Sequence, residues 1–261
     1  MLVKFFKIKF IFLSVIFLFL YSSKSYSLLS QETDLNTRDE NFQYSNATYF
    51  SMSVTSTFAL LTLSAIGSYQ RPPEFNGFDN PEDRHITYDN YIRNITNPVM
   101  DKDNFFLNYI AHPYAGSIYY LTARNSNFSI FESFLTAVTM STFWEYGPEG
   151  LMEYVSIQDL IITPVLGSAF GELFYQVNTR IIKNNHKLFN SKILGYTFLT
   201  LSDPMYAFLT LSPPLRKILK QSGNHSKNNN NNNINQNPNN LMYSGWQFSK
   251  DTVKLQIRFP I

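Results

Sequence analysis

The chain of 261 residues contains no cysteine. This absence excludes disulfide bonds, thiolate metal ligands and a cysteine nucleophile. It also excludes the bacterial lipoproteins, whose lipid is attached to a cysteine that follows the signal peptide. The sequence has no phosphate-binding loop, no dinucleotide fingerprint and no GxSxG or HExxH motif. None of the common enzyme signatures therefore assigns an activity to the chain.

Charged side chains are also scarce. They make up 15% of the residues, against about 25% in an ordinary soluble domain. Aromatic residues make up 16%, with 24 phenylalanines and 17 tyrosines. A chain that is rich in aromatic residues and poor in charge is typical of a membrane-facing or densely packed protein. No basic cluster is present, so we expect no nucleic acid partner.

Residues 1–27 are predicted to be a signal peptide. Three lysines lie among the first nine residues, an apolar run follows at Phe10–Leu20, and small residues stand at Ser25 and Ser27. The alternative is an uncleaved membrane anchor, but the apolar run is shorter than the roughly 20 residues that cross a bilayer. Without the four lysines of this segment, 17 basic face 19 acidic side chains, a net charge of −2.

The rest of the chain divides into four regions. Residues 28–100 form an N-terminal region with one apolar helix over Thr48–Tyr69. Residues 101–222 form a helical core domain. Residues 223–240 are predicted to be a disordered, asparagine-rich linker, because such a segment buries too little apolar surface to order itself. Residues 241–261 are predicted to form a β-hairpin, since apolar and polar residues alternate near the C terminus.

These regions predict a mainly α fold, a compact bundle of amphipathic and apolar helices with a small C-terminal β-hairpin. Within the core, three helices are expected between Asp103 and Ile182. Two short helices should then meet at Pro204, with a second break at Pro213 and Pro214. The hairpin needs a partner because two strands are not stable alone.

Several ionisable residues lie in segments that are apolar enough to be buried. Glu145 continues the helix face of Phe134, Val138 and Ser141, so its carboxyl group should point inward. A buried carboxylate must be paired, hydrogen-bonded or protonated. Trp144 beside it can shield it and offers one N–H donor.

The third core helix carries both polar and very small residues. Ser156 and Asp159 have the spacing of a helix-capping box. Thr163, Gly167 and Gly171 then repeat every four residues, a stripe that lets two helices approach closely. Pro164 either kinks this helix or begins a new one with Thr163 as its N-cap.

His112, Glu145 and Asp159 are the candidate catalytic residues, because a histidine with two carboxylates has the groups for general acid–base chemistry. The alternative is a buried network that fixes helix packing. These groups could also bind a divalent metal, but no ligand spacing indicates one, so we predict no metal and no cofactor. The other members of the predicted polar network are Asn108, Ser117, Tyr120, Arg124, Trp144, Glu149, Thr163 and Glu172.

The same block resembles the bacterial family known as domain of unknown function 3943. The resemblance covers Asp101–Tyr175, with weaker similarity to about Leu219. It implies an exported protein of the Gram-negative envelope and implies no activity. The matching positions are Asp103, Asn108, His112, Pro113, Gly116, Ser117, Tyr120, Arg124, Ser133, Trp144, Glu145, Glu149, Ser156, Asp159, Thr163, Gly167, Gly171 and Glu172.

We therefore expect an exported, membrane-associated envelope protein in the periplasm or outer membrane of a Gram-negative bacterium. Its role is predicted to be structural or based on interaction. Its expected partners are the membrane lipid surface and a β-rich outer-membrane protein bound through residues 241–261. The alternative is a membrane-surface enzyme that acts on lipid or cell-wall material with the His/Glu/Asp cluster. The sequence leaves open whether the protein is an enzyme.

Overall fold

The computed structural model describes residues 35–36, 39, 42–69, 86–100, 105–234, 243–249 and 252–258. The predicted signal peptide and the linker residues 235–240 lie outside these ranges. Of the described residues, 79% are helical, which confirms the predicted mainly α fold. The elements follow one another as β1 (Leu35–Asn36), β2 (Tyr44–Ser45), α2 (Asn46–Tyr69), α3 (Tyr88–Thr96), η3 (Leu107–Ala111), α4 (His112–Arg124), α5 (Ile130–Trp144), η4 (Glu145–Glu149), α6 (Ile157–Lys183), α7 (Lys192–Ser202), α8 (Pro204–Leu211) and α9 (Pro213–Ile234).

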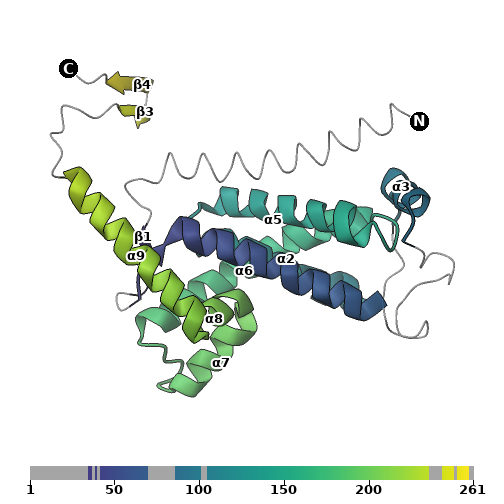
Figure 1. Cartoon of the computed structure of the whole chain (residues 1–261), viewed down its shortest axis with the longest axis horizontal. Coiled ribbons are helices and arrows are strands. Elements are labelled where there is room, and N and C mark those ends of the chain that lie inside the picture. The colour runs from purple at the N-terminus through teal and green to yellow at the C-terminus, as the bar shows by residue number, and fades with distance from the viewer. Residues whose placement is uncertain are drawn as a thin grey trace.

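Helices α2, α4, α5 and α6 form the main bundle (Figure 1). Near one end of α2 the Phe50 ring stacks on Phe128 at 5.0 Å, and further along Phe58 meets Phe143 edge-on at 4.8 Å. Helix α2 therefore runs in the same direction as α5. The apolar helix predicted for residues 48–69 is confirmed, and so are the three helices of the core.

The contact between α4 and α6 is unusually close. A Cβ atom on Gly116 would collide with the carbonyl oxygen of Thr163, and one on Gly167 would lie 2.5 Å from the carbonyl carbon of Gly116. Such an approach requires residues without a side chain at the crossing. The predicted small-residue stripe is therefore a helix-packing face. Pro164 lies inside the continuous helix α6, so it does not begin a new helix.

Helices α7, α8 and α9 pack over the end of the bundle where α6 finishes. Their core includes Ile181, Leu199, Leu209 and Leu219, all of which are buried. The chain breaks where it was predicted to break. Helix α8 begins at Pro204, and α9 begins at Pro213, because a proline in the first turn has no intrahelical hydrogen bond to lose.

Helix α9 enters the asparagine-rich segment and ends at Ile234. This corrects the predicted start of the linker at residue 223. The helix is fixed upstream, where Leu219 is buried and Gly223 lies against the backbone of Gln43. Adding residues to an existing helix costs far less than starting one, so polar asparagines can continue it.

Strands β3 (Tyr243–Ser249) and β4 (Thr252–Arg258) are paired antiparallel near the C terminus. Their side chains lie outside what the structure describes. The hairpin as a folded unit, and the partner against which it would pack, therefore stay predictions.

The glycine contact gives a direct test of the bundle. Gly116→Ala should lower the free energy of unfolding by about 1–3 kcal/mol, since a methyl group must push two backbones apart. Gly147→Ala is the matched control, because the nearest atom to its new Cβ is 3.9 Å away. Urea denaturation of both variants measures the difference. Equal stability of the two variants would contradict the close α4–α6 packing.

Candidate functional site

His112, Glu145 and Asp159 come together at one end of the bundle. One ligand atom from each lies within 4.8 Å of the other two. His112 is the first residue of α4, Glu145 lies where α5 passes into the π-helix η4, and Asp159 lies in the first turn of α6. The predicted proximity of the three candidate residues is thus present. Their catalytic role stays a prediction.

A carboxylate from α5 takes part in capping α6. Ser156 is the N-cap, and its hydroxyl accepts a hydrogen bond from the backbone N–H of Asp159 at 3.0 Å. In a complete capping box, the Asp159 side chain would bind the N–H of Ser156 in return. Here Glu145 Oε2 accepts that N–H instead, at 3.0 Å. The Asp159 carboxylate can therefore face α4.

The Asp159 carboxylate faces the histidine. His112 Nδ1 lies 3.7 Å from Asp159 Oδ1 and 3.4 Å from the hydroxyl of Thr163. Asp159 is buried, whereas the side chain of His112 keeps 17% of its surface exposed. The histidine is therefore the member of the cluster that solvent can reach.

Glu149 extends the cluster by one more carboxyl group. Burial raises the pKa of Glu145, although hydrogen bonds from the Ser156 N–H and the Glu149 side chain act against it. Burial also raises the pKa of Glu149, and repulsion by the Glu145 charge raises it further. Two neighbouring carboxyl groups in a shielded place cannot both be ionised at low cost. Burial and mutual repulsion thus favour the protonated form of both carboxyl groups.

A second polar group forms at the other end of α4. Arg124 Nε donates to Glu172 Oε2 at 2.8 Å, and the Tyr120 hydroxyl donates to the same oxygen at 2.6 Å. The Arg124 guanidinium also lies 4.1 Å from the centre of the Tyr175 ring. Burial alone would raise the pKa of Glu172, but the hydrogen bonds from Arg124, Tyr120 and Gln176 outweigh burial and lower it.

The predicted polar network thus divides into two groups. His112 and Arg124 stand at opposite ends of α4, about 18 Å apart at a rise of about 1.5 Å per residue. Three other predicted members contribute to packing. Asn108 is buried in η3, Ser117 donates to the carbonyl of its own helix, and Trp144 is half-buried at the end of α5.

Another buried network was missed by sequence reasoning. Asn125 donates to Asp203 Oδ2 at 2.6 Å and to the Tyr49 hydroxyl at 3.2 Å. The other oxygen of Asp203 accepts the N–H of Tyr206 and caps α8. The sequence did indicate that Asp203 caps a helix, because an aspartate followed by a proline is typical of a helix start. The partner Asn125 could not be identified, because it is far away in the sequence.

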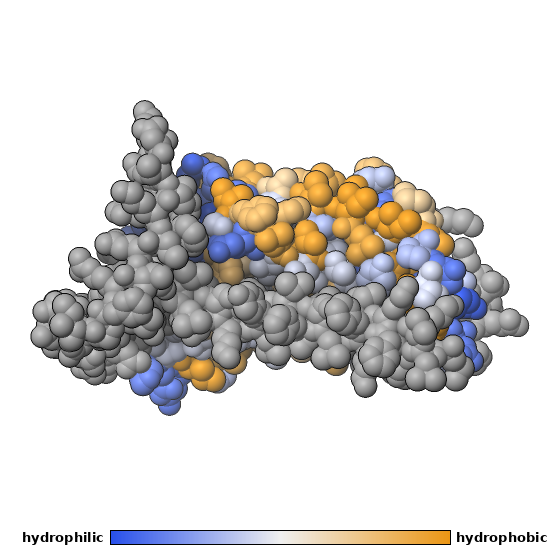
Figure 2. All heavy atoms as spheres, turned by 90° about the horizontal axis from the view of Figure 1, so that it is seen from above, coloured by the Kyte–Doolittle hydropathy of each residue, from blue (hydrophilic) through white to orange (hydrophobic). Residues whose placement is uncertain are grey.

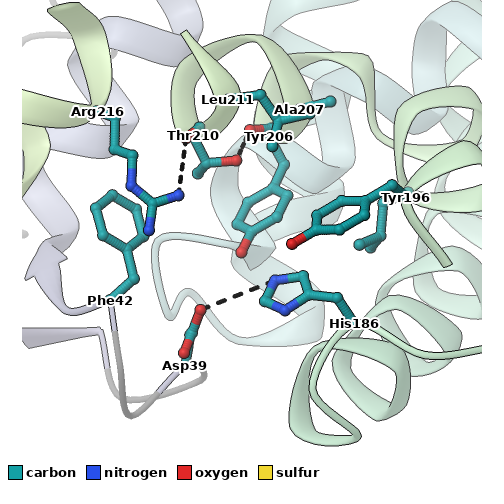
Figure 3. A pocket seen from close by; sticks show the side chains of 10 residues that line it. Asp39, Phe42, His186, Tyr196, Tyr206, Ala207, Thr210, Leu211 and Arg216 are labelled. Atoms are coloured by element: carbon teal, nitrogen blue, oxygen red, sulfur yellow. Dashed lines mark hydrogen bonds and ion pairs between the residues drawn. The ribbon is translucent and has the colours of Figure 1, made fainter. Parts of the chain in front are cut away.

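A separate pocket of about 170 Å³ lies beside α7, α8 and α9 (Figure 3). His186 lies 3.9 Å from Asp39 and stacks on the Tyr196 ring at 5.1 Å. Arg216 lies over the Phe42 ring at 4.5 Å. None of the residues predicted for the functional site lines this pocket.

Comparison with known proteins gives one match. Residues 97–205 match the family described as Domain of unknown function (DUF3943). This range holds both polar groups and most of the bundle, and it confirms the resemblance noted in the sequence. No curated protein and no solved structure matches the chain.

The Glu172 pair predicts how stability depends on pH. The pKa of Glu172 is lower in the folded protein than in the unfolded chain, so the ionised carboxylate stabilises the fold. This stabilisation is fully present above the ordinary carboxyl pKa of about 4.3 and is lost as the pH falls through the pKa of the folded protein. Wild type should exceed Glu172→Gln in unfolding free energy at pH 7, and the difference should vanish in acid. Urea denaturation from pH 7 to 3 measures it.

Glu132→Gln is the control for this series. Glu132 is an exposed carboxylate in the capping box of α5, where glutamine keeps the acceptor. The difference in unfolding free energy between wild type and Glu172→Gln should change with pH. A difference that stayed constant would contradict the ion pair between Glu172 and Arg124.

Proposed function

We propose that this chain, which carries the domain of unknown function 3943, is an exported envelope protein that lies against a membrane through an apolar face of its helical bundle. The observation that carries the proposal is the inverted polarity of α5 and α6. In α5 and in the first half of α6 most of the buried residues are small or polar, and many large apolar residues face outward.

Helix α6 shows the inversion most clearly. Along its first half it buries Asp159, Thr163 and Gly167. Ile161 and Leu173, by contrast, each keep 57% of their surface exposed. A helix at the surface of a water-soluble bundle has the opposite arrangement. Helices that face lipid pack together through small and polar residues, because burying large apolar residues gains little there.

Helix α5 repeats the pattern. It buries Ser133, Thr136 and Ser141, whereas Phe131 is 66% exposed. The segment before α4 adds further exposed apolar residues. Figure 2 shows the resulting broad band of apolar surface on the described part of the molecule. Other outward apolar side chains of these segments are Phe105, Phe106, Tyr109, Ile110, Ile130, Leu135, Ile157, Val165 and Phe170.

The spacing of charges favours a helix that lies along a membrane over one that crosses it. Helix α6 is long and apolar enough to span a bilayer, and only 22% of its most apolar window is buried. The core helix of a soluble protein can have the same length and composition, so these two properties do not distinguish spanning from packing. The uncharged stretch between Asp159 and Glu172 is about 18 Å long. A bilayer core is about 30 Å thick.

Vesicle flotation tests the proposed face. The purified chain should float with vesicles of phosphatidylethanolamine and phosphatidylglycerol. Ile161→Lys should lower the ratio of bound to free protein about tenfold, since a lysine costs up to about 3 kcal/mol at the centre of the apolar layer and about 1.4 kcal/mol already gives tenfold.

Ile193→Lys is the matched control, because Ile193 is an outward isoleucine on α7 that is 79% exposed, more than Ile161. It should float as wild type does. A wild-type chain that stays unbound would overturn the proposal, and equal losses in the two variants would show that the α6 face is not the contact. Extraction at alkaline pH then separates a surface-bound chain, which is released, from one that crosses the bilayer.

Export is tested by the mature N terminus. If residues 1–27 are a signal peptide, N-terminal sequencing of the chain recovered from the envelope of a Gram-negative host should begin at Leu28. Recovery of an unprocessed chain from the cytoplasm would contradict export. This outcome is independent of vesicle binding, because flotation uses purified protein.

A further inference from the structure

We propose that His112, Glu145 and Asp159 bind one divalent transition-metal ion. One ligand atom from each residue lies within 4.8 Å of the others. Three evenly spaced ligand atoms at about 2.1 Å from a single ion are separated by about 3.6 Å. A shift of up to about 0.7 Å for each ligand atom is therefore enough to place all three on one ion.

The ligand set indicates the class of metal. One imidazole nitrogen and two carboxylate oxygens suit Zn²⁺, Mn²⁺, Fe²⁺ or Co²⁺. The absence of cysteine excludes the thiolate sites that hold copper(I) and iron–sulfur clusters. All-oxygen sites for Mg²⁺ or Ca²⁺ do not use a histidine. The inference departs from our sequence-based expectation of no metal, which relied on ligand spacing along the chain.

The three side chains are held by rigid parts of the fold. The glycine contact between α4 and α6 fixes His112 against Asp159. The hydrogen bond from the Ser156 N–H fixes Glu145 at the start of α6. Each ligand thus comes from a different helix whose position is set by backbone contacts, which is the pre-organisation that a metal site requires.

The surroundings also fit a bound cation. Glu145 and Asp159 are buried with relative exposures of 1% and 3%, and a bound cation would compensate the charge of two ionised carboxylates in such a shielded place. Oxygen Oε2 of Glu149 is closed off from solvent and has no hydrogen-bond partner among the described residues, and the Glu149 side chain is hydrogen-bonded to Glu145. A carboxyl group that supports a ligating carboxylate in this way is typical of an outer ligand shell.

The site leaves room for water on the ion. Three protein ligands do not complete a tetrahedral or octahedral shell, and sites with an open position are usually those that bind a substrate or water. His112 is the member that remains in contact with solvent. An ion would therefore enter, and exchange its water, on the side of α4.

Cobalt(II) binding tests the site without any assumption about activity. The full chain is purified in detergent, stripped with a chelator and titrated with Co²⁺ alone. We expect one Co²⁺ per chain, with visible d–d absorption from nitrogen and oxygen ligands, and displacement by Zn²⁺. His112→Asn and Asp159→Asn should each weaken Co²⁺ binding at least tenfold. Glu132→Gln, which removes an exposed carboxylate elsewhere, should leave it unchanged.

Two outcomes would overturn the inference. One is a wild-type chain that takes up no Co²⁺ or Zn²⁺ at micromolar concentration. This result does not depend on whether any variant folds. The other is unchanged binding in both His112→Asn and Asp159→Asn, with circular dichroism showing intact helices, because the ion would then lie elsewhere. Membrane association is measured separately and does not depend on either result.

Discussion

The backbone contact between α4 and α6 at Gly116 and Gly167 is the constraint on which the rest of the structure depends. It brings two helices that run in the same direction into a register that nothing larger than glycine permits. That register places His112 beside Asp159 at one end and Arg124 beside Glu172 at the other. Both polar groups are therefore consequences of one packing contact.

Local features of the fold could be predicted from the sequence. Prolines and caps act within a few residues, so the break at Pro204 and the N-cap at Ser156 follow directly from residue type. The stripe ending at Gly171 could be identified because its period matches a helix face. The meeting of His112 with Glu145 was expected only as an inference from helix faces and the family resemblance, and the packing of the helices was needed to establish it.

Features that depend on distant partners could not be predicted. Ser156 and Asp159 have the spacing of a complete capping box, yet Glu145 from another helix supplies the returning bond. Asn125 and Asp203 show the same limit, since neither residue identifies the other in the sequence. The orientation of α5 was predicted in part. Glu145 points inward as expected, but its helix buries small polar residues beside Met140 and turns Phe131 and Leu135 outward.

The inverted helix faces and the two polar ends have a common physical explanation. A bundle whose outer surface is apolar can place charged groups only at its ends or in pairs inside it. Both ends of α4 follow this rule, because Arg124 pairs with Glu172 at one end and the other end gathers His112 with three carboxyl groups. The arginine neutralises its carboxylate, whereas at the acidic end burial favours the protonated form of Glu145 and Glu149. The proposed metal ion would take the place of those protons, which is why it fits this end of the helix and not the end that already has an arginine.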